Sequence, residues 1–197
     1  MNRLAALVIC FSLAGGLSCA MRAPSVRAPE LPAVSASADP TPHDAADEIE
    51  ALLARHMTGL APFEVRRTAA TLVREAKRNG IEPSLVLAVI HTESGYYNFA
   101  RSSVGALGLM QIMPSTGEML AREAGIRWTG PELLFDPEVN LRLGTRYLAV
   151  LRARYGDWTR ALAAYNWGPG EIDRRLAVGE VLPDKYASRV YARLAKR

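Results

Sequence analysis

Apolar side chains recur at helical spacing, every three or four residues, along most of the chain. In the first such segment the apolar positions are Ile49, Leu52, Leu53 and Met57. Asp44 is placed to cap this helix at its start, and Gly59 is placed to end it. A second segment repeats the pattern from Val65 to Ala76 and ends at Asn79 and Gly80. Both segments are predicted to be amphipathic helices.

A third segment, which begins at Pro83, is apolar on every side. All of its residues from Leu85 to Ile90 are apolar, as expected for a helix buried in the middle of a domain. A buried strand is the alternative, because the run contains β-branched residues. The proline at its start and its helical neighbours favour a helix. Residues 84–93 are therefore predicted to be the central helix, which ends at Glu93.

Further helices are predicted in the second half of the chain from their caps and their glycines. They run from residue 115 to 124, from Asp136 to about Tyr155, from Asp157 to a break at Gly168 and Pro169, and from Pro183 to Leu194. Very little of the sequence shows the alternation of a strand. The fold class is therefore predicted to be all-α.

By composition, the 197 residues divide into three parts. Residues 1–20 combine Arg3, an apolar run and small residues, which is the pattern of an export signal. The run is shorter than the roughly 20 residues that cross a bilayer. Residues 21–44 are rich in Pro, Ala and Ser, and are predicted to be a disordered linker because they lack large apolar side chains. Residues 45–197 are predicted to form one globular domain.

Both cysteines, Cys10 and Cys19, lie in the predicted signal. Cleavage near Ala20 would leave a mature protein without disulfides or thiolate metal ligands. Cys19 also ends a Gly-Leu-Ser-Cys sequence that is similar to a bacterial lipobox, although the usual leucine three places before the cysteine is Gly16 here. A lipid anchor on Cys19 and an ordinary cleaved signal therefore stay open as alternatives.

The charge pattern argues against nucleic acid as a partner. The formal net charge is +4, and the basic residues are spread along the predicted helices without interleaved aromatic side chains. The histidines His43, His56 and His91 fall in different segments, so no metal-binding cluster is expected. The sequence also suggests no cofactor.

Glu93 is a candidate for acid–base chemistry. It ends the apolar helix just before Ser94 and Gly95, where unpaired carbonyls and the negative end of the helix dipole disfavour a carboxylate. Partial burial would disfavour the charged form further, so the pKa of Glu93 is expected to be raised, as a general acid requires. Taken alone, this position favours a structural polar residue over a catalytic one.

A glycine-rich segment follows from Gly105 to Pro114. Its two glycines permit tight turns and the close approach of a ligand to the backbone. Its Leu, Met and Gln side chains are suitable walls for a sugar-binding groove. Packing in the core is the alternative for the Leu and Met residues.

Three motifs occur in order along the chain: Glu93-Ser94-Gly95, the run from Ser103 to Pro114, and Ala164-Tyr165-Asn166-Trp167-Gly168-Pro169-Gly170. In this order and spacing the chain resembles the soluble lytic transglycosylase catalytic (SLT) domain, a branch of the lysozyme-like superfamily. The resemblance extends from about Val65 to Leu194. Because three ordered motifs carry it, it is far more specific than any one of them.

The resemblance implies a lysozyme-like fold and cleavage of the β-1,4 bond between N-acetylmuramic acid and N-acetylglucosamine, leaving a 1,6-anhydro end. It implies that Glu93 protonates the leaving oxygen and then, as a carboxylate, accepts a proton from the 6-hydroxyl of the sugar. No second acid lies between Ser94 and Gly117, and one carboxylate suffices when the nucleophile is intramolecular. Glu118, Glu123 and Asp136 stay open as second acids in three dimensions.

Roles for further residues are implied by the same resemblance. Tyr165 is expected to place its hydroxyl near Glu93 and to orient the carboxyl. Trp167 stands where the family often has a small residue, and both stacking on a sugar face and packing of the turn stay open. Asn166 is expected to hold the local turn as well as to bind substrate. The implied substrate-binding residues are Ser103, Gly105, Gln111, Met113 and Asn166.

The sequence thus predicts an exported bacterial enzyme that acts on peptidoglycan strands, in the periplasm or anchored there as a lipoprotein. One alternative is a muramidase of the goose-lysozyme kind, which shares the glutamate but adds water. The other is a non-catalytic scaffold that binds peptidoglycan without cutting it.

Overall fold

The computed structural model describes residues 42–195, which form eight α-helices and one short 3-10 helix. The predicted signal, both cysteines and nearly all of the predicted linker lie outside the described residues. The all-α prediction is confirmed, because the described residues contain no strand beyond isolated bridges at Arg101–Leu107 and Leu107–Ile112. Among residues 42–195, none of the helices is both long enough and apolar enough to span a bilayer.

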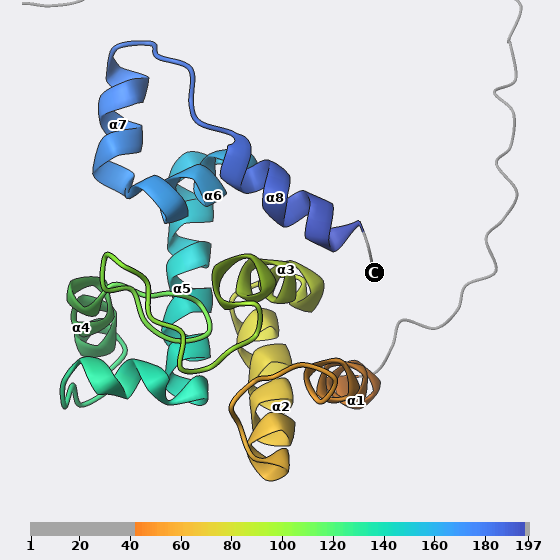
Figure 1. The fold of residues 1–197 in the computed structure, drawn as a ribbon. Helices are drawn as coiled ribbons and strands as arrows, with labels where there is room; N and C mark the ends of the chain where they lie inside the picture. Colours follow the sequence, from red (N-terminus) through yellow and green to blue (C-terminus); the bar gives the residue numbers. More distant parts are fainter. Residues whose placement is uncertain (1–41, 196–197) are drawn as a thin grey trace, which may run out of the picture. The chain divides into compact units, whose positions relative to one another are not determined.

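The connections between the helices differ in length (Figure 1). The longest among the described residues runs from residue 95 to 113, between α3 and α4, and is the loop that follows α3. The helices are α1 (Pro42–Leu53), α2 (Pro62–Arg78), α3 (Pro83–Ser94), α4 (Pro114–Glu123), η1 (Pro131–Phe135), α5 (Pro137–Tyr155), α6 (Trp158–Trp167), α7 (Pro169–Ala177) and α8 (Lys185–Leu194). The sequence pattern did not predict η1, which is too short for a periodic signal. The pattern also did not predict α7. Gly168 and Pro169 indicate the end of one helix, but a proline can equally begin the next one, as Pro169 does here.

The first helix differs from its prediction at both ends. It begins at Pro42, inside the predicted linker 21–44, and it ends at Leu53 and not at Gly59. Met57, predicted to lie on the apolar face of this helix, is 91% exposed. The segment between α1 and α2 instead contacts the loop that follows α3. The backbone N–H of Asn98 in that loop donates to the Thr58 carbonyl oxygen at 2.8 Å.

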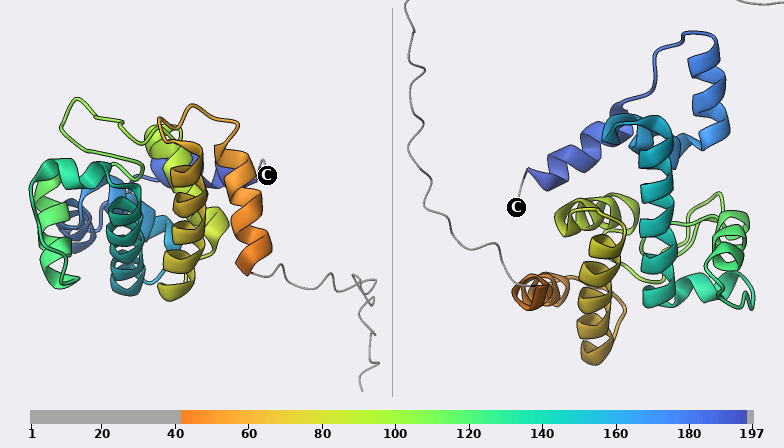
Figure 2. Two further views of the ribbon diagram at one scale, coloured as in Figure 1. Left: turned by 90° about the horizontal axis from the view of Figure 1, so that it is seen from below. Right: turned by 180° about the vertical axis from the view of Figure 1, so that it is seen from behind.

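Helix α3 is the central helix, as predicted, and not a strand. Its residues from Leu85 to Ile90 are all buried, so every side of this part of the helix faces protein. It packs against α2 and against α8 (Figure 1), while α2 and α5 run side by side (Figure 2). The helix is capped by Gly95, which has a left-handed backbone conformation (φ 58°). The N–H of Gly95 donates to the His91 carbonyl oxygen, and the helix therefore ends just after Glu93.

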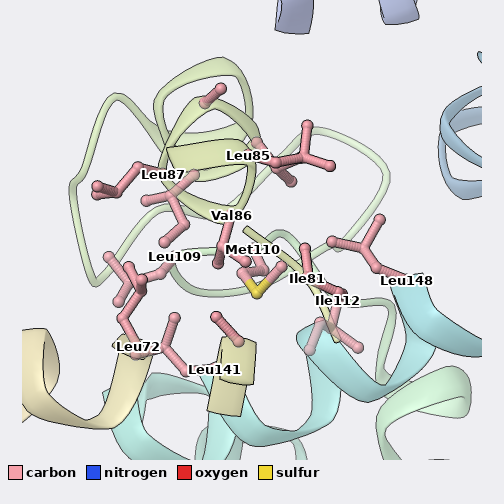
Figure 3. Close-up of a cluster of buried hydrophobic side chains, with 14 of the residues drawn as sticks. Leu72, Ile81, Leu85, Val86, Leu87, Leu109, Met110, Ile112, Leu141 and Leu148 are labelled. Carbon is pink, nitrogen blue, oxygen red and sulfur yellow. The ribbon is translucent and has the colours of Figure 1, made fainter. Parts of the chain in front are cut away.

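The core joins α2, α3 and α5 to the loop that follows α3. Figure 3 shows these side chains in one cluster, among them Leu72, Val86, Leu109, Met110 and Leu141. Each is at most 2% exposed, and burying a side chain of this size stabilises a fold by roughly 1.5–3 kcal/mol. The Leu and Met residues of the glycine-rich segment that are buried here belong to the core.

Asn140 of α5 makes three hydrogen bonds, two to this loop and one to η1. Its Oδ1 accepts from the Met110 N–H at 2.8 Å, and its Nδ2 donates to the carbonyl oxygens of Leu107 at 3.1 Å and Leu134 at 2.8 Å. The amide is fully buried. Gly108 leaves space for it, since a Cβ at that position would lie 2.3 Å from Asn140 Nδ2.

We predict that Asn140→Ala lowers the free energy of unfolding by about 2–4 kcal/mol, because it leaves the buried Met110 N–H and the Leu134 carbonyl without partners and removes one of the two partners of the Leu107 carbonyl. Urea denaturation followed by circular dichroism measures the change. Asn166→Ala is the matched control, since Asn166 is exposed on α6, and its effect is expected to stay within about 0.5 kcal/mol. Equal effects of the two substitutions would show that the Asn140 hydrogen bonds do not stabilise the fold.

Candidate active site

Glu93 occupies the last turn of α3 and is met there by a tyrosine of α8. The Tyr186 hydroxyl donates to Glu93 Oε1 at 2.5 Å. The carboxyl is half-buried, while the Tyr186 side chain is buried. Because α3 and α8 pack directly against each other, the tyrosine holds one carboxyl oxygen in a fixed position.

The pKa of Glu93 is raised above its ordinary value, as the sequence predicted. Burial is the largest cause, because it disfavours the charged form. The hydrogen bond from Tyr186 and the positive charge of Arg189 lower the pKa in part, since both favour the carboxylate. The net effect is a carboxyl that holds its proton to a higher pH than an ordinary glutamate does.

Tyr165 does not make the contact that was expected of it. Its hydroxyl donates to the Met110 carbonyl oxygen at 2.7 Å, so it ties α6 to the loop after α3 and does not orient the Glu93 carboxyl. It nevertheless lies near the acid: burial chiefly raises the pKa of Tyr165, and the charges of Glu93 and Tyr147 raise it further. The orienting hydrogen bond comes from Tyr186, which lies within the helix predicted from Pro183 to Leu194.

A signal for Tyr186 was present in the sequence. Tyr186 and Val190 are four residues apart on one face of α8, and both are buried. A tyrosine on a buried face needs a partner for its hydroxyl, and the buried end of α3 offers a carboxyl. The pairing of these two helices, which the sequence did not reveal, decides that this partner is Glu93.

Gln111 braces the loop with its amide. Its Nε2 donates to the carbonyl oxygens of Ala100 at 3.1 Å and Gly108 at 2.9 Å. These bonds hold a backbone with φ 48°, a conformation that non-glycine residues seldom adopt. The amide hydrogens of Gln111 are thus engaged within the loop, and its contact with the substrate stays a prediction.

Of the other predicted substrate-binding residues, Ser103, Gly105 and Met113 belong to this loop, and Asn166 belongs to α6. Ser103 is exposed before Gly105, whose φ of 90° suits a glycine. Met113 is 40% exposed and directly precedes α4. Asn166 is exposed near the end of α6, and no hydrogen bond among the described residues joins it or Ser103 to Glu93.

The side chain of Trp167, also at the end of α6, is partly exposed to solvent and partly packed against α7. It is 51% exposed, and the Arg175 guanidinium lies 5.5 Å from the centre of its ring. One face of the indole is therefore occupied by a cation from α7.

The three acids that were left open as second carboxylates have other surroundings. Asp136 caps α5, accepting from the backbone N–H groups of Glu138 and Val139. Glu123 lies 3.6 Å from Arg146, and Glu118 is exposed on α4. None of the three is among the groups that act on the pKa of Glu93.

Two of the three histidines, His56 and His91, contact the ring of Tyr96, whereas His43 lies 3.0 Å from the Asp47 carboxylate. The Tyr96 ring lies 4.6 Å from that of His56 and 4.8 Å from that of His91, measured between centroids. Within residues 42–195, no group of three or more His, Cys, Asp or Glu side chains could hold a metal ion. His91 thus packs against an aromatic ring.

Comparison with known proteins gives a family match and curated relatives. The model of the Transglycosylase SLT domain matches residues 71–183. The membrane-bound lytic murein transglycosylase C of Pectobacterium atrosepticum is 40% identical over 126 residues, covering 55% of this chain and 35% of the relative. The soluble lytic murein transglycosylase of Salmonella typhimurium is 38% identical over 101 residues, covering 50% of this chain and 16% of the relative. The chain thus spans about a third or less of the length of these relatives.

Solved structures show the same fold. A lytic transglycosylase Slt from Pseudomonas aeruginosa, an inactive mutant, is 32% identical with a TM-score of 0.52, covering 75% of this chain and 26% of that one. The 70 kDa soluble lytic transglycosylase of Escherichia coli has a TM-score of 0.59 at 24% identity, covering 78% of this chain and 29% of that one, and at this identity it supports the fold alone. Since the matched range of the family model, residues 71–183, is more than half of the 197 residues and includes Glu93, the loop and Tyr165, the chain belongs to the Transglycosylase SLT domain family.

Proposed function

We propose that this chain is a peptidoglycan lytic transglycosylase, which cleaves the β-1,4 bond between N-acetylmuramic acid and N-acetylglucosamine without water. The observation that carries the proposal is Glu93, a half-buried carboxyl with a raised pKa and with no second carboxylate acting on it. The names of the relatives, which are lytic murein transglycosylases, support the same activity. Glycosidases that use water or a protein nucleophile ordinarily need two flanking carboxylates.

Glu93 serves in turn as acid and as base. Its protonated carboxyl donates the proton to the glycosidic oxygen as the bond between that oxygen and the anomeric carbon breaks. The resulting carboxylate then accepts the proton of the 6-hydroxyl as that oxygen bonds to the same carbon, while the acetamido group of the substrate stabilises the cation between the two steps. The proton returns to Glu93, the ring closes as a 1,6-anhydro sugar, and no water is consumed.

Tyr186 supports both steps through its hydrogen bond. It fixes the direction of the carboxyl, and it stabilises the carboxylate that exists between the two proton transfers. Tyr165 acts on the same reaction indirectly, by holding the loop at the Met110 carbonyl. The exposed residues Ser103, Met113 and Asn166, with the backbone at Gly105, contact the glycan beyond the acid.

The proposed place of action is the periplasm. The export pattern of residues 1–20 and the alternative of a lipid anchor on Cys19 both lead there. Several relatives are named as membrane-bound, which supports the lipoprotein alternative.

The products of purified sacculi test the reaction. Mass analysis of the released muropeptides is expected to show anhydro ends, each lighter by one water than a hydrolysed end. Hydrated ends alone would contradict the proposal and favour the goose-type muramidase. Sacculi that bind the wild type but are cut by neither the wild type nor Glu93→Gln would favour the scaffold.

Replacement of the acid is expected to abolish most of the activity. Glu93→Gln lowers kcat by about 10²–10⁴-fold, because a general acid contributes that much. Glu118→Gln is the matched control, since Glu118 is an exposed carboxylate on α4, and it is expected to keep near wild-type kcat. A comparable loss in the control would instead make Glu118 the second acid.

The two tyrosines are expected to differ in their effect on the pH profile. Activity requires protonated Glu93, so it is present at low pH and lost as the pH rises through the pKa of Glu93. Tyr186→Phe removes a hydrogen bond that lowers this pKa, so the alkaline limb moves to higher pH and kcat falls. Tyr165→Phe lowers activity by loosening the loop but leaves the limb in place, because a neutral hydroxyl bonded to Met110 does not act on the Glu93 charge. Equal shifts in both variants would contradict the assignment of Tyr186.

A further inference from the structure

Three phenylalanines from three parts of the fold line one cavity. Its volume is about 310 Å³, within the range of roughly 300–1,000 Å³ that ligand sites occupy. We call it the aromatic pocket, and its principal lining residues are Phe63, Glu64, Asn98, Phe99, Phe135 and Asp136. They come from the start of α2, from the loop that follows α3 and from the junction of η1 with α5. None of the lining residues belongs to α8 or to the last turn of α3, so the aromatic pocket is separate from the candidate active site.

The rings at the aromatic pocket are accessible from solvent. Phe63 is 64% exposed and Phe99 is 48% exposed, although phenylalanine is ordinarily a buried residue. The centre of the Phe99 ring lies 5.8 Å from that of the Phe135 ring. Gly59 leaves space for Phe99, because a Cβ at Gly59 would lie 3.0 Å from a carbon of that ring. The rings thus form an apolar wall that is open to a ligand.

Asn98 brings a hydrogen-bond acceptor to this wall. It is 1% exposed, and its Oδ1 accepts no hydrogen bond within residues 42–195. The direction of the amide is fixed, because its Nδ2 donates to the Phe135 carbonyl oxygen at 2.8 Å. A buried acceptor without a partner costs about 1–3 kcal/mol. A ligand with an O–H or N–H donor can supply the partner when the exposed ring of Phe99 moves to admit it.

The charges around the aromatic pocket are nearly balanced. Glu138 and Arg67, which also line it, form an ion pair with each other. The other two carboxylates, Glu64 and Asp136, each use one oxygen to cap a helix. Arg101 lies over one of the rings, with its guanidinium carbon 5.3 Å from the ring centre. Three carboxylates and two guanidinium groups leave little net charge, which suits a neutral ligand better than an ion.

A neutral ligand with an apolar face and many donors is a saccharide. The C–H face of a pyranose ring packs on aromatic rings, as other apolar surfaces do. Its hydroxyl groups and the N–H of an acetamido group donate to amide and carboxylate oxygens, which the aromatic pocket offers at Asn98, Glu64 and Asp136. Aromatic walls with a few polar groups that fix orientation are typical of small-molecule sites.

We propose that the aromatic pocket binds an N-acetylated sugar of peptidoglycan at a second site, which takes no part in the cleavage. The proposal rests on the proposed function for the choice of this glycan. While one stretch of glycan lies at Glu93, the aromatic pocket holds another. This second contact keeps the enzyme on the sacculus between cuts, because it raises the effective concentration of glycan at the first.

Binding to the inactive Glu93→Gln protein tests the site. The probe is the tetramer of N-acetylglucosamine, which is uncharged and carries no peptide, and NMR spectra of ¹⁵N-labelled protein report which backbone amides respond. The amides of Gly59, Phe99 and Asp136 are expected to shift to saturation. Phe99→Ala is expected to weaken this binding by about twofold to tenfold, as for the loss of one aromatic contact, whereas Phe99→Trp keeps a ring and retains it.

Two controls separate this effect from general apolarity and from charge. Val181→Ala shortens an apolar side chain that is 89% exposed, in the connection between α7 and α8, and is expected to leave the binding unchanged. The cation n-butylammonium is expected not to shift the amides of the aromatic pocket. Shifts with this cation and none with the sugar would overturn the proposal. Thermal unfolding of each variant verifies that it is folded.

Cleavage by the active enzyme tests what the second site does. The wild type and Phe99→Ala are compared on intact sacculi and on a soluble glycan fragment of two disaccharide units, which is too short to occupy both sites. The rate on sacculi is expected to fall about twofold to tenfold in Phe99→Ala, while the rate on the fragment stays at the wild-type value. Equal rates on sacculi would contradict the role of the aromatic pocket in holding the enzyme there.

The outcomes distinguish this inference from the proposed function. If the tetramer shifts amides near Glu93 but none at the aromatic pocket, and the wild type cleaves sacculi, the second site is overturned and the transglycosylase is left intact. If the wild type cleaves neither substrate while the tetramer still shifts the amides of the aromatic pocket, the proposed function is overturned and the saccharide site is left intact.

Discussion

The hydrogen bond between Tyr186 and Glu93 connects the end of the central helix to the last helix, and the chemistry of the site depends on it. Burial alone would leave the carboxyl protonated but free to rotate. The tyrosine fixes one oxygen at 2.5 Å and, with Arg189, limits how far burial raises the pKa. A group that must give up a proton and take one back within a single reaction needs this balance, because either charge state must be accessible.

The same packing that builds the core also builds the wall of the site. Met110 lies in the hydrophobic cluster, its N–H donates to Asn140 of α5, and its carbonyl accepts from Tyr165 of α6. Gln111 next to it braces the loop from the inside. A loop attached at so many points is rigid, so the exposed Ser103 and Met113 within it are held at fixed distances from the acid.

Much of this structure could be predicted from local sequence. The all-apolar run that follows Pro83 identified the central helix and placed Glu93 at its end, because burial and capping are local properties of a segment. The partner of the carboxyl could not be identified in this way. It depends on how α8 packs on α3. Two tyrosines were available, and the motif pointed to Tyr165 while the packing selected Tyr186. Gln111 was assigned by its motif to the groove, but the motif did not show that its amide hydrogens are engaged within the loop.

The proposed chemistry depends on a Glu93 carboxyl that keeps its proton to a higher pH than an ordinary glutamate does. A ¹³C NMR titration of the protein labelled at the glutamate carboxyl carbon measures this directly, with Glu93→Gln used to assign the resonance. One glutamate is expected to titrate above the ordinary value of about 4.3, and its signal is expected to be missing from the variant. Titration of Glu93 at or below the ordinary value would contradict the proposed chemistry.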